Sequence, residues 1–136
     1  VSTIFGRIRH LPEAKELFKA YGHSLLDSRW ARARGLSEAR SRFKNLLNNS
    51  VNFQIQGTAG HVMNRAMLMT QRLFLENNID GGIVMTIHDE QIVEVREDQA
   101  EQAAQIIKYA MENCVDLSPI KLKATPIIGK SYGDCK

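Results

Sequence analysis

A short polar motif, His88-Asp89-Glu90, lies between two runs of mainly β-branched and apolar residues, 83–87 and 91–95. This pattern predicts a β-hairpin with the three polar residues at its tip. A carboxylate in a tight turn is held rigidly, and Mg²⁺ prefers one or two protein carboxylates together with substrate phosphates. The motif is therefore compatible with metal-dependent phosphate chemistry at Asp89, to which Glu90 adds charge. Taken alone, however, it favours the alternative of a solvated turn, because aspartate is also a favoured turn residue.

Two amides, Asn52 and Gln56, stand four residues apart just before Gly57. If this turn is helical, both side chains point the same way and can contact one ligand. Gly57 and Gly60 would allow another backbone to approach the start of the following helix. The alternative is a polar helix entry with Thr58 as the N-cap, and the segment taken alone favours that interpretation.

The hydrophobic pattern predicts the elements that must position these residues. Helical spacing predicts helices over residues 12–21, 37–48, 57–77 and 98–114. Alternation predicts the two hairpin strands and a last edge strand over residues 120–124. The expected fold class is α+β, with helices packed on a small antiparallel sheet in the order helix–strand–strand–helix–strand.

Local signals mark the ends of the predicted helices. Pro12 suits a first helical turn, and Gly22 suits a helix end. Ser37 is a suitable N-cap, and Asn48-Asn49-Ser50 would end the helix that it starts. Asp98 and Glu101 have the spacing of a capping box, so the following helix should begin there.

Positive charge is concentrated in the first part of the chain. Residues 1–50 carry ten Lys or Arg and four acids, a net charge of +6, whereas residues 51–136 carry eight and eleven, a net charge of −3. We therefore expect a basic, mainly helical segment over residues 1–50 and a separate subdomain over residues 51–136. A basic surface suits a polyanion, because each neutralised phosphate releases counterions. The alternative is a solvated basic helical face.

The composition excludes several classes of protein. With 43% hydrophobic and 24% charged residues, the chain is neither a disordered tail nor a collagen-like repeat. It has no apolar stretch of membrane-spanning length, and Arg7, Arg9 and His10 stand where a signal peptide would be apolar, so no membrane partner is expected. Cys114 and Cys135 have no metal-binding spacing and favour free thiols in a reducing compartment such as the cytoplasm.

Four stretches occur in an order that resembles the C-terminal palm of A-family DNA polymerases, the bacterial DNA polymerase I-like group. Two of them are Asn52-Phe-Gln-Ile-Gln56-Gly-Thr-Ala59 and Thr86-Ile-His88-Asp89-Glu90-Gln-Ile-Val-Glu-Val95. Upstream, Phe5-Gly-Arg7-Ile-Arg9-His-Leu-Pro12 is similar to the family's Gly-Arg-x-Arg-x-Leu-Pro segment, and Gly129-Lys-Ser-Tyr132 is similar to its closing Gly-x-x-Trp stretch. The resemblance covers nearly the whole chain except about residues 15–41, and it favours a phage or bacterial source.

The resemblance implies a metal site at the hairpin. Asp89 would be the second of two metal-binding aspartates, with Glu90 as a weaker, supporting acid. Two Mg²⁺ ions would bridge Asp89, a partner aspartate and the incoming dNTP while the primer 3′-hydroxyl attacks.

The resemblance also implies contacts to primer-template DNA. His88 would lie beside the primer terminus. Asn52 and Gln56 would lie near the minor-groove edges of newly formed base pairs, where every Watson–Crick pair presents acceptors, so their amides would test pair geometry without sequence preference. Arg7 and Arg9 would contact phosphates.

The sequence also departs from the family pattern. Neither the first catalytic aspartate nor the nucleotide-gripping fingers helix has a counterpart in it. Asn48 occupies a position that is basic in the family, and Arg42 or Lys44 would compensate for the missing DNA contact. An insertion is expected near residues 24–36. We therefore expect the C-terminal part of a template-directed DNA polymerase, inactive without its upstream half, whether that half is in the same polypeptide or a separate subunit. The alternatives are a nonenzymatic nucleic-acid-binding module and a small α/β interaction domain.

Overall fold

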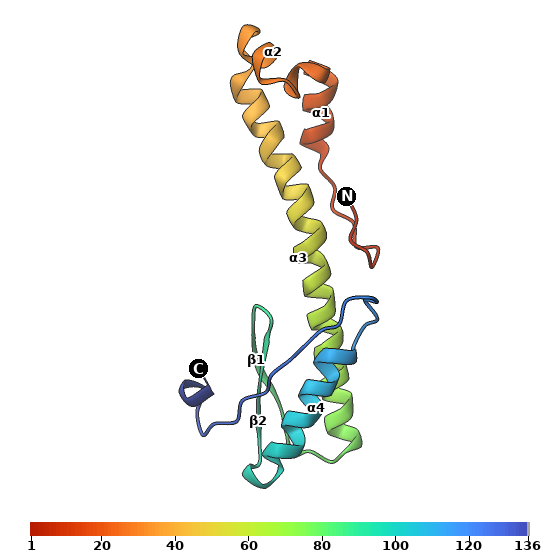
Figure 1. The fold of residues 1–136 in the computed structure, drawn as a ribbon, viewed down its shortest axis with the longest axis vertical. Helices are drawn as coiled ribbons and strands as arrows, with labels where there is room; N and C mark the ends of the chain where they lie inside the picture. Colours follow the sequence, from red (N-terminus) through yellow and green to blue (C-terminus); the bar gives the residue numbers. More distant parts are fainter. Residues whose placement is uncertain (136) are drawn as a thin grey trace. The chain divides into compact units, whose positions relative to one another are not determined.

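The computed structural model describes residues 1–135. In chain order its elements are α1 (Pro12–Tyr21), η1 (Gly22–Leu25), α2 (Ser28–Ala33), α3 (Ser37–Glu76), β1 (Gly81–Ile87), β2 (Glu90–Val95), η2 (Glu97–Gln99), α4 (Ala100–Asn113) and η3 (Tyr132–Cys135) (Figure 1). They form two compact units, Val1–Thr58 and the residues from Ala59 onward, and each unit is described by itself. The α+β class is confirmed, and the division expected after residue 50 stays a prediction.

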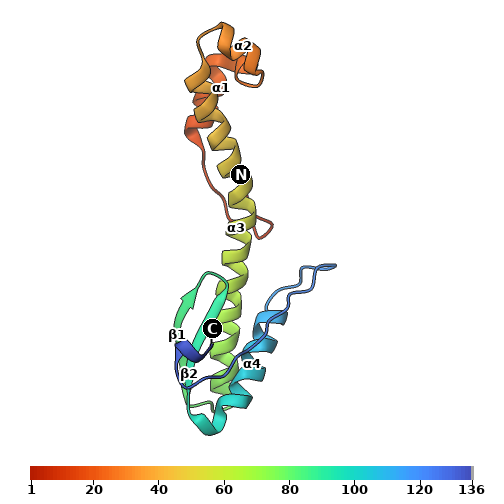
Figure 2. The same cartoon turned by 60° about the vertical axis from the view of Figure 1, so that its left-hand side comes forward.

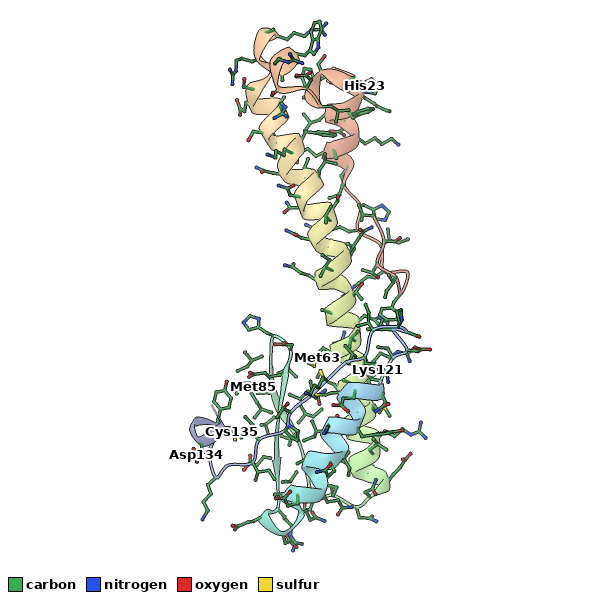
Figure 3. All side chains as sticks on the ribbon, viewed as in Figure 1. His23, Met63, Met85, Lys121, Asp134 and Cys135 are labelled. Carbon is green, nitrogen blue, oxygen red and sulfur yellow. The ribbon has the colours of Figure 1, made fainter. Side chains whose placement is uncertain are left out.

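The first unit contains α1, η1, α2 and the first part of α3. Helix α1 begins at Pro12 and ends before Gly22, whose φ of 55° and N–H bond to the Phe18 carbonyl terminate it, as expected. The Phe18 ring stacks on Phe43 at 6.1 Å and meets His23 edge-on at 5.6 Å. His23 is labelled in Figure 3. Leu25, Ala31 and Phe43 are the buried hydrophobic residues of this unit.

Helix α3 runs without interruption over 40 residues, so the prediction of two helices separated by Asn48-Asn49-Ser50 is wrong. Asparagine and serine are only moderate helix formers, but they do not break a helix as proline does. The Ser50 hydroxyl donates to the Leu47 carbonyl at 2.7 Å, a bond made within the helix. The helix ends at Glu76, where Asn78 takes a φ of 54° and the N–H of Ile79 bonds to the Phe74 carbonyl.

The second unit packs an antiparallel hairpin against two helices. Strands β1 and β2 pair from Gly81↔Val95 to Ile87↔Glu90, with an irregularity between Ile83 and Met85. Both views show the hairpin beside α4 and the C-terminal part of α3 (Figures 1 and 2). The buried core of this unit consists of Phe74 from α3, Ile79 and Ala103, with Val93, Val95, Ile106 and Ile107 against it.

The predicted strand over residues 120–124 is wrong. This segment has only an isolated bridge between Leu117 and Ile120, and Ile120 is 68% exposed. The backbone N–H of Ala124 donates instead to the Glu112 carboxylate at 3.0 Å. An alternating pattern becomes a strand only where a neighbouring backbone supplies the ladder, and no other described strand pairs with this segment.

The helix after the hairpin is confirmed, but its capping box is not. Helix α4 begins at Ala100 after the short η2 turn, and no side chain caps it. Asp98 forms two hydrogen bonds with Arg96 instead of capping the helix. Ala103, Ala104 and Ala110 are buried, as the helical spacing predicts. No helix within residues 1–135 is both long and apolar enough to span a membrane.

Candidate functional site

Asp89 is the second residue of a two-residue turn. Ile87 and Glu90 pair as the last residues of the ladder, which leaves only His88 and Asp89 outside it. The expected three-residue tip is therefore wrong, because Glu90 is already the first residue of β2. His88 takes a φ of 53°, in the left-handed region that such tight hairpin turns require and that is uncommon for residues other than glycine. The backbone of Asp89 is thus fixed by the ladder on both sides.

The tip presents its polar side chains to solvent. His88, Asp89 and Glu90 are all exposed. Within the described part of the chain, no cluster of three or more His, Cys, Asp or Glu side chains is able to hold a metal ion. The two adjacent carboxylates fit Mg²⁺ as a partial ligand set, because this ion keeps several water or phosphate ligands besides one or two carboxylates.

A partly buried hydrogen bond joins the hairpin to α3 two residues after Asp89. Thr70 is fully buried, and its hydroxyl donates to Gln91 Oε1 at 3.0 Å. The Gln91 amide nitrogen lies 3.7 Å from the sulfur of Met63, which Figure 3 labels on α3. Since a hydroxyl buried without a partner is costly, this bond favours one register of the hairpin on the helix.

We expect the Thr70–Gln91 pair to be energetically coupled. Thr70→Val leaves Gln91 Oε1 without its donor and should lower the free energy of unfolding by about 1–3 kcal/mol. Gln91→Leu should cost less, because a helical Thr70 hydroxyl can turn to the carbonyl one turn earlier. The double variant should lie close to the unmodified chain in urea unfolding, so the coupling energy should approach the sum of the two single costs, about 1–3 kcal/mol.

Thr58→Val is the matched control for this cycle. The Thr58 hydroxyl donates only to the Gln54 carbonyl within α3, at 2.6 Å and in an exposed position. Its removal should change the unfolding free energy by no more than about 0.5 kcal/mol. Strictly additive effects of Thr70→Val and Gln91→Leu would contradict the pairing.

In the first unit, the N-terminal segment folds back on itself and packs on α3. Ser2 and Ile8 form an antiparallel bridge, and the Arg9 N–H bonds to the Val1 carbonyl at 2.8 Å. The Arg9 guanidinium lies 5.7 Å from the centre of the Phe53 ring. A Cβ on Gly57 would meet the buried Thr3 methyl at 2.8 Å, so this glycine permits a close approach, as expected, although to a side chain rather than a backbone.

The two amide side chains singled out in the sequence lie on α3, the helix on which the N-terminal segment packs. Asn52 and Gln56 are both exposed on α3, one turn apart, and Arg9 packs over Phe53 between them in sequence. Arg7 and Arg9 are exposed as well, so the structure brings basic and amide side chains to one part of this unit. Asp89 belongs to the second unit.

Two expectations about the start of the helix predicted over residues 57–77 are wrong. Thr58 does not cap a helix, because α3 is already helical there and the hydroxyl bonds back to Gln54. A Cβ on Gly60 would meet no atom within 4 Å, so no close approach requires a glycine at this position.

Burial raises the pKa of one side chain, and a hydrogen-bonded ion pair raises the pKa of another. Burial raises the pKa of the Cys114 thiol, whose sulfur donates to the Val62 carbonyl at 3.5 Å. The hydrogen bond to Glu76 raises the pKa of Arg72, in an exposed pair along α3. Both cysteines are free thiols, in agreement with the sequence-based expectation.

All candidate site residues lie within the part of the chain that one protein-family model matches. The model of DNA polymerase family A matches residues 1–134. The chain belongs to DNA polymerase family A. This membership confirms the resemblance drawn from the amide motif and the hairpin motif.

Individual relatives of family A agree with this assignment. DNA polymerase I of Pseudomonas aeruginosa is 30% identical over 91% of this chain and 11% of its own length. Thermostable DNA polymerase I of Thermus filiformis is 29% identical over 100% of this chain and 13% of its own length. DNA polymerase theta of Drosophila melanogaster is 36% identical over 77% of this chain and 6% of its own length. The chain thus spans a small part of these relatives, and no solved structure matches it significantly.

Proposed function

We propose that this chain is the C-terminal palm part of a template-directed DNA polymerase that adds dNTPs to a primer 3′-hydroxyl. The observation that carries the proposal is the placement of Asp89 in a two-residue turn between paired strands, in a chain of DNA polymerase family A. Such a turn holds a carboxylate in place before substrate arrives, and this preorganisation favours electrostatic catalysis.

The hairpin residues have distinct roles in this proposal. Asp89 and Glu90 would hold Mg²⁺, which when bound activates the primer 3′-hydroxyl and stabilises the leaving pyrophosphate in a two-metal displacement. Asp89 would be the stronger ligand, since it stands in the turn itself, whereas Glu90 belongs to the ladder of β2. His88 would lie beside the primer terminus, and a partner aspartate would come from the upstream half.

The first unit would contribute contacts to primer-template DNA. Arg7 and Arg9 are exposed cations, suited to hold phosphates without reading sequence. Asn52 and Gln56 present amide donors from the adjacent stretch of α3, suited to the acceptors of the minor groove.

The exposed apolar surface supports the need for an upstream half. Among the described residues, eighteen large hydrophobic side chains are exposed, whereas only nine hydrophobic residues are buried. Leu68 and Leu75, seven residues apart on α3, are 72% and 71% exposed. Apolar surface of this extent is typical of a subdomain that packs against further chain.

Primer extension tests the proposal directly. We expect no nucleotide incorporation on a primed template by the chain alone, because it contributes only one of the two metal-binding aspartates. Incorporation should appear when the upstream portion of the polymerase is supplied, in the same polypeptide or as a separate subunit. Mg²⁺-dependent activity of the chain alone would refute the missing-aspartate argument.

Primer extension combined with measurements of DNA binding at different salt concentrations separates the alternatives. A nonenzymatic nucleic-acid-binding module would bind DNA in a strongly salt-dependent way without incorporation by any combination. A small α/β interaction domain would bind no DNA at physiological salt. Either outcome would remove the polymerase assignment of this chain.

A further inference from the structure

The short helix α2 exposes the chain's only tryptophan among arginines. Trp30 is 59% exposed, whereas its neighbour Ala31 is 1% exposed and anchors the helix. The Arg29 side chain is 91% exposed, and Arg32 and Arg34 are exposed too. The outward side of α2 therefore combines one large aromatic ring with three permanent cations.

Local contacts hold this arrangement in place. The Arg34 guanidinium lies 5.9 Å from the centre of the Trp30 ring, and Arg34 Nη1 donates to the Ser24 hydroxyl at 3.2 Å. Asp27, the only acid between Gly22 and Leu36, caps α2 by accepting the Arg29 N–H at 2.7 Å. Its carboxylate is thus engaged with the helix N-terminus, and its ion pair with the Arg29 side chain is long, at 3.8 Å.

We propose that α2 binds single-stranded nucleic acid, with a base stacked on Trp30 and phosphates paired with Arg29 and Arg32. Exposed aromatic rings beside cations are the combination that binds single strands, because every base offers a π-face and the arginines follow the backbone. In a duplex the base faces are already stacked on one another, so Trp30 selects the single strand. Tryptophan and arginine are enriched in protein interfaces too, but three arginines with a single acid between Gly22 and Leu36 favour a polyanion.

The position of this surface makes the proposal independent of the catalytic assignment. Trp30 belongs to the first unit and to the region where the sequence predicts an insertion, and its ring contact with Arg34 lies within that unit. The binding surface goes beyond the proposed polymerase reaction, which assigns no role to α2. Loss of single-strand binding would therefore leave the role of Asp89 untouched, and the reverse also holds.

Intrinsic fluorescence tests the proposal, because the only tryptophan lies at the site. Titrating the full chain with a single-stranded oligothymidylate should quench Trp30 emission, whereas a duplex of the same length should quench it much less. For two phosphate contacts, the logarithm of the association constant should fall with the logarithm of salt with a slope of about −1.4. Absence of quenching at low salt would overturn the proposal.

Variants identify the residues involved. Arg29→Ala with Arg32→Ala should remove most of the salt dependence, and Trp30→Leu, measured by anisotropy of a labelled oligothymidylate, should weaken binding at least about fivefold. The control Arg72→Ala with Arg96→Ala removes the same charge from the second unit. Equal weakening by both arginine pairs would show nonspecific attraction and overturn the proposal. A shift of Trp30 emission on adding the upstream portion, with loss of quenching, would assign α2 to an interface between the halves and also overturn it.

Discussion

Replacing Asp89 with asparagine is expected to remove nucleotide incorporation by the assembled polymerase. Asparagine keeps the size and the turn preference of aspartate, so the hairpin should persist. It loses the charge that a hard divalent cation requires. Loss of several kcal/mol of transition-state stabilisation corresponds to a fall in kcat on the order of a thousandfold. Primer-extension rates and primer-template affinity, measured separately, should show the loss in turnover with affinity largely retained.

Glu90 and Glu94, two carboxylates of the following strand β2, provide the comparison variants for this result. Glu90→Gln should reduce turnover by a smaller factor, because the proposed function gives Glu90 only a supporting role. Glu94→Gln removes the same charge from an exposed position farther along β2, next to the Gly82 pairing, and should leave turnover near normal. Near-normal turnover of Asp89→Asn, or an equal loss in Glu94→Gln, would defeat the metal assignment.

Gly81→Ala is expected to be the most destabilising single change at the base of the hairpin. A Cβ there would clash with the Glu94 carbonyl oxygen and would lie 2.7 Å from the Val95 Cα. Both are backbone atoms of β2, so relief requires the two strands to separate and the ladder to weaken. Overpacking of this kind should lower the free energy of unfolding by about 3 kcal/mol or more, measured by urea unfolding followed by circular dichroism.

Gly82→Ala is the matched control, one residue along the same strand. Only the flexible Gln71 side chain, at 3.9 Å, lies near a Cβ at this position. The change should therefore alter stability by no more than about 0.5 kcal/mol. Similar unfolding midpoints for the two variants would contradict the close approach at Gly81.

Weakening the β1–β2 ladder at the base of the hairpin should also lower the turnover of the polymerase. Asp89 depends on the β1–β2 ladder for its position, since Ile87 and Glu90 close the turn that contains it. If Gly81→Ala weakens that ladder, the assembled polymerase should lose turnover together with stability. Gly82→Ala should retain both.

Elements specified by local signals could be predicted from the sequence. The proline start and glycine end of α1, the alternating runs of the hairpin and the alanine-rich face of α4 each depend on residues close in the chain. The tip motif at Asp89 was identified for the same reason, because a hairpin turn is defined by a few consecutive residues. Only the assignment of Glu90 to the tip was wrong, by one position.

Features that depend on distant neighbours could not be predicted in this way. The sequence signals at residues 48–50 are as compatible with a helix interior as with a helix end, and α3 continues through them. Residues 120–124 alternate like a strand, yet no described strand pairs with them beyond one isolated bridge. Thr70 and Gln91 carry no local sign of their contact, since 21 residues separate them.

The amino-acid sequence by itself determined the family, the hairpin and the acidic residue at its turn, because these depend on residue types in a short, ordered stretch. Only the tertiary structure decided that Thr70 is buried against Gln91, that Gly81 has no room for a side chain, and that Arg9 lies over Phe53. The physical reason is that burial, close approach and partner choice are properties of two surfaces brought together by folding. A single stretch of sequence specifies one of those surfaces and leaves the other open.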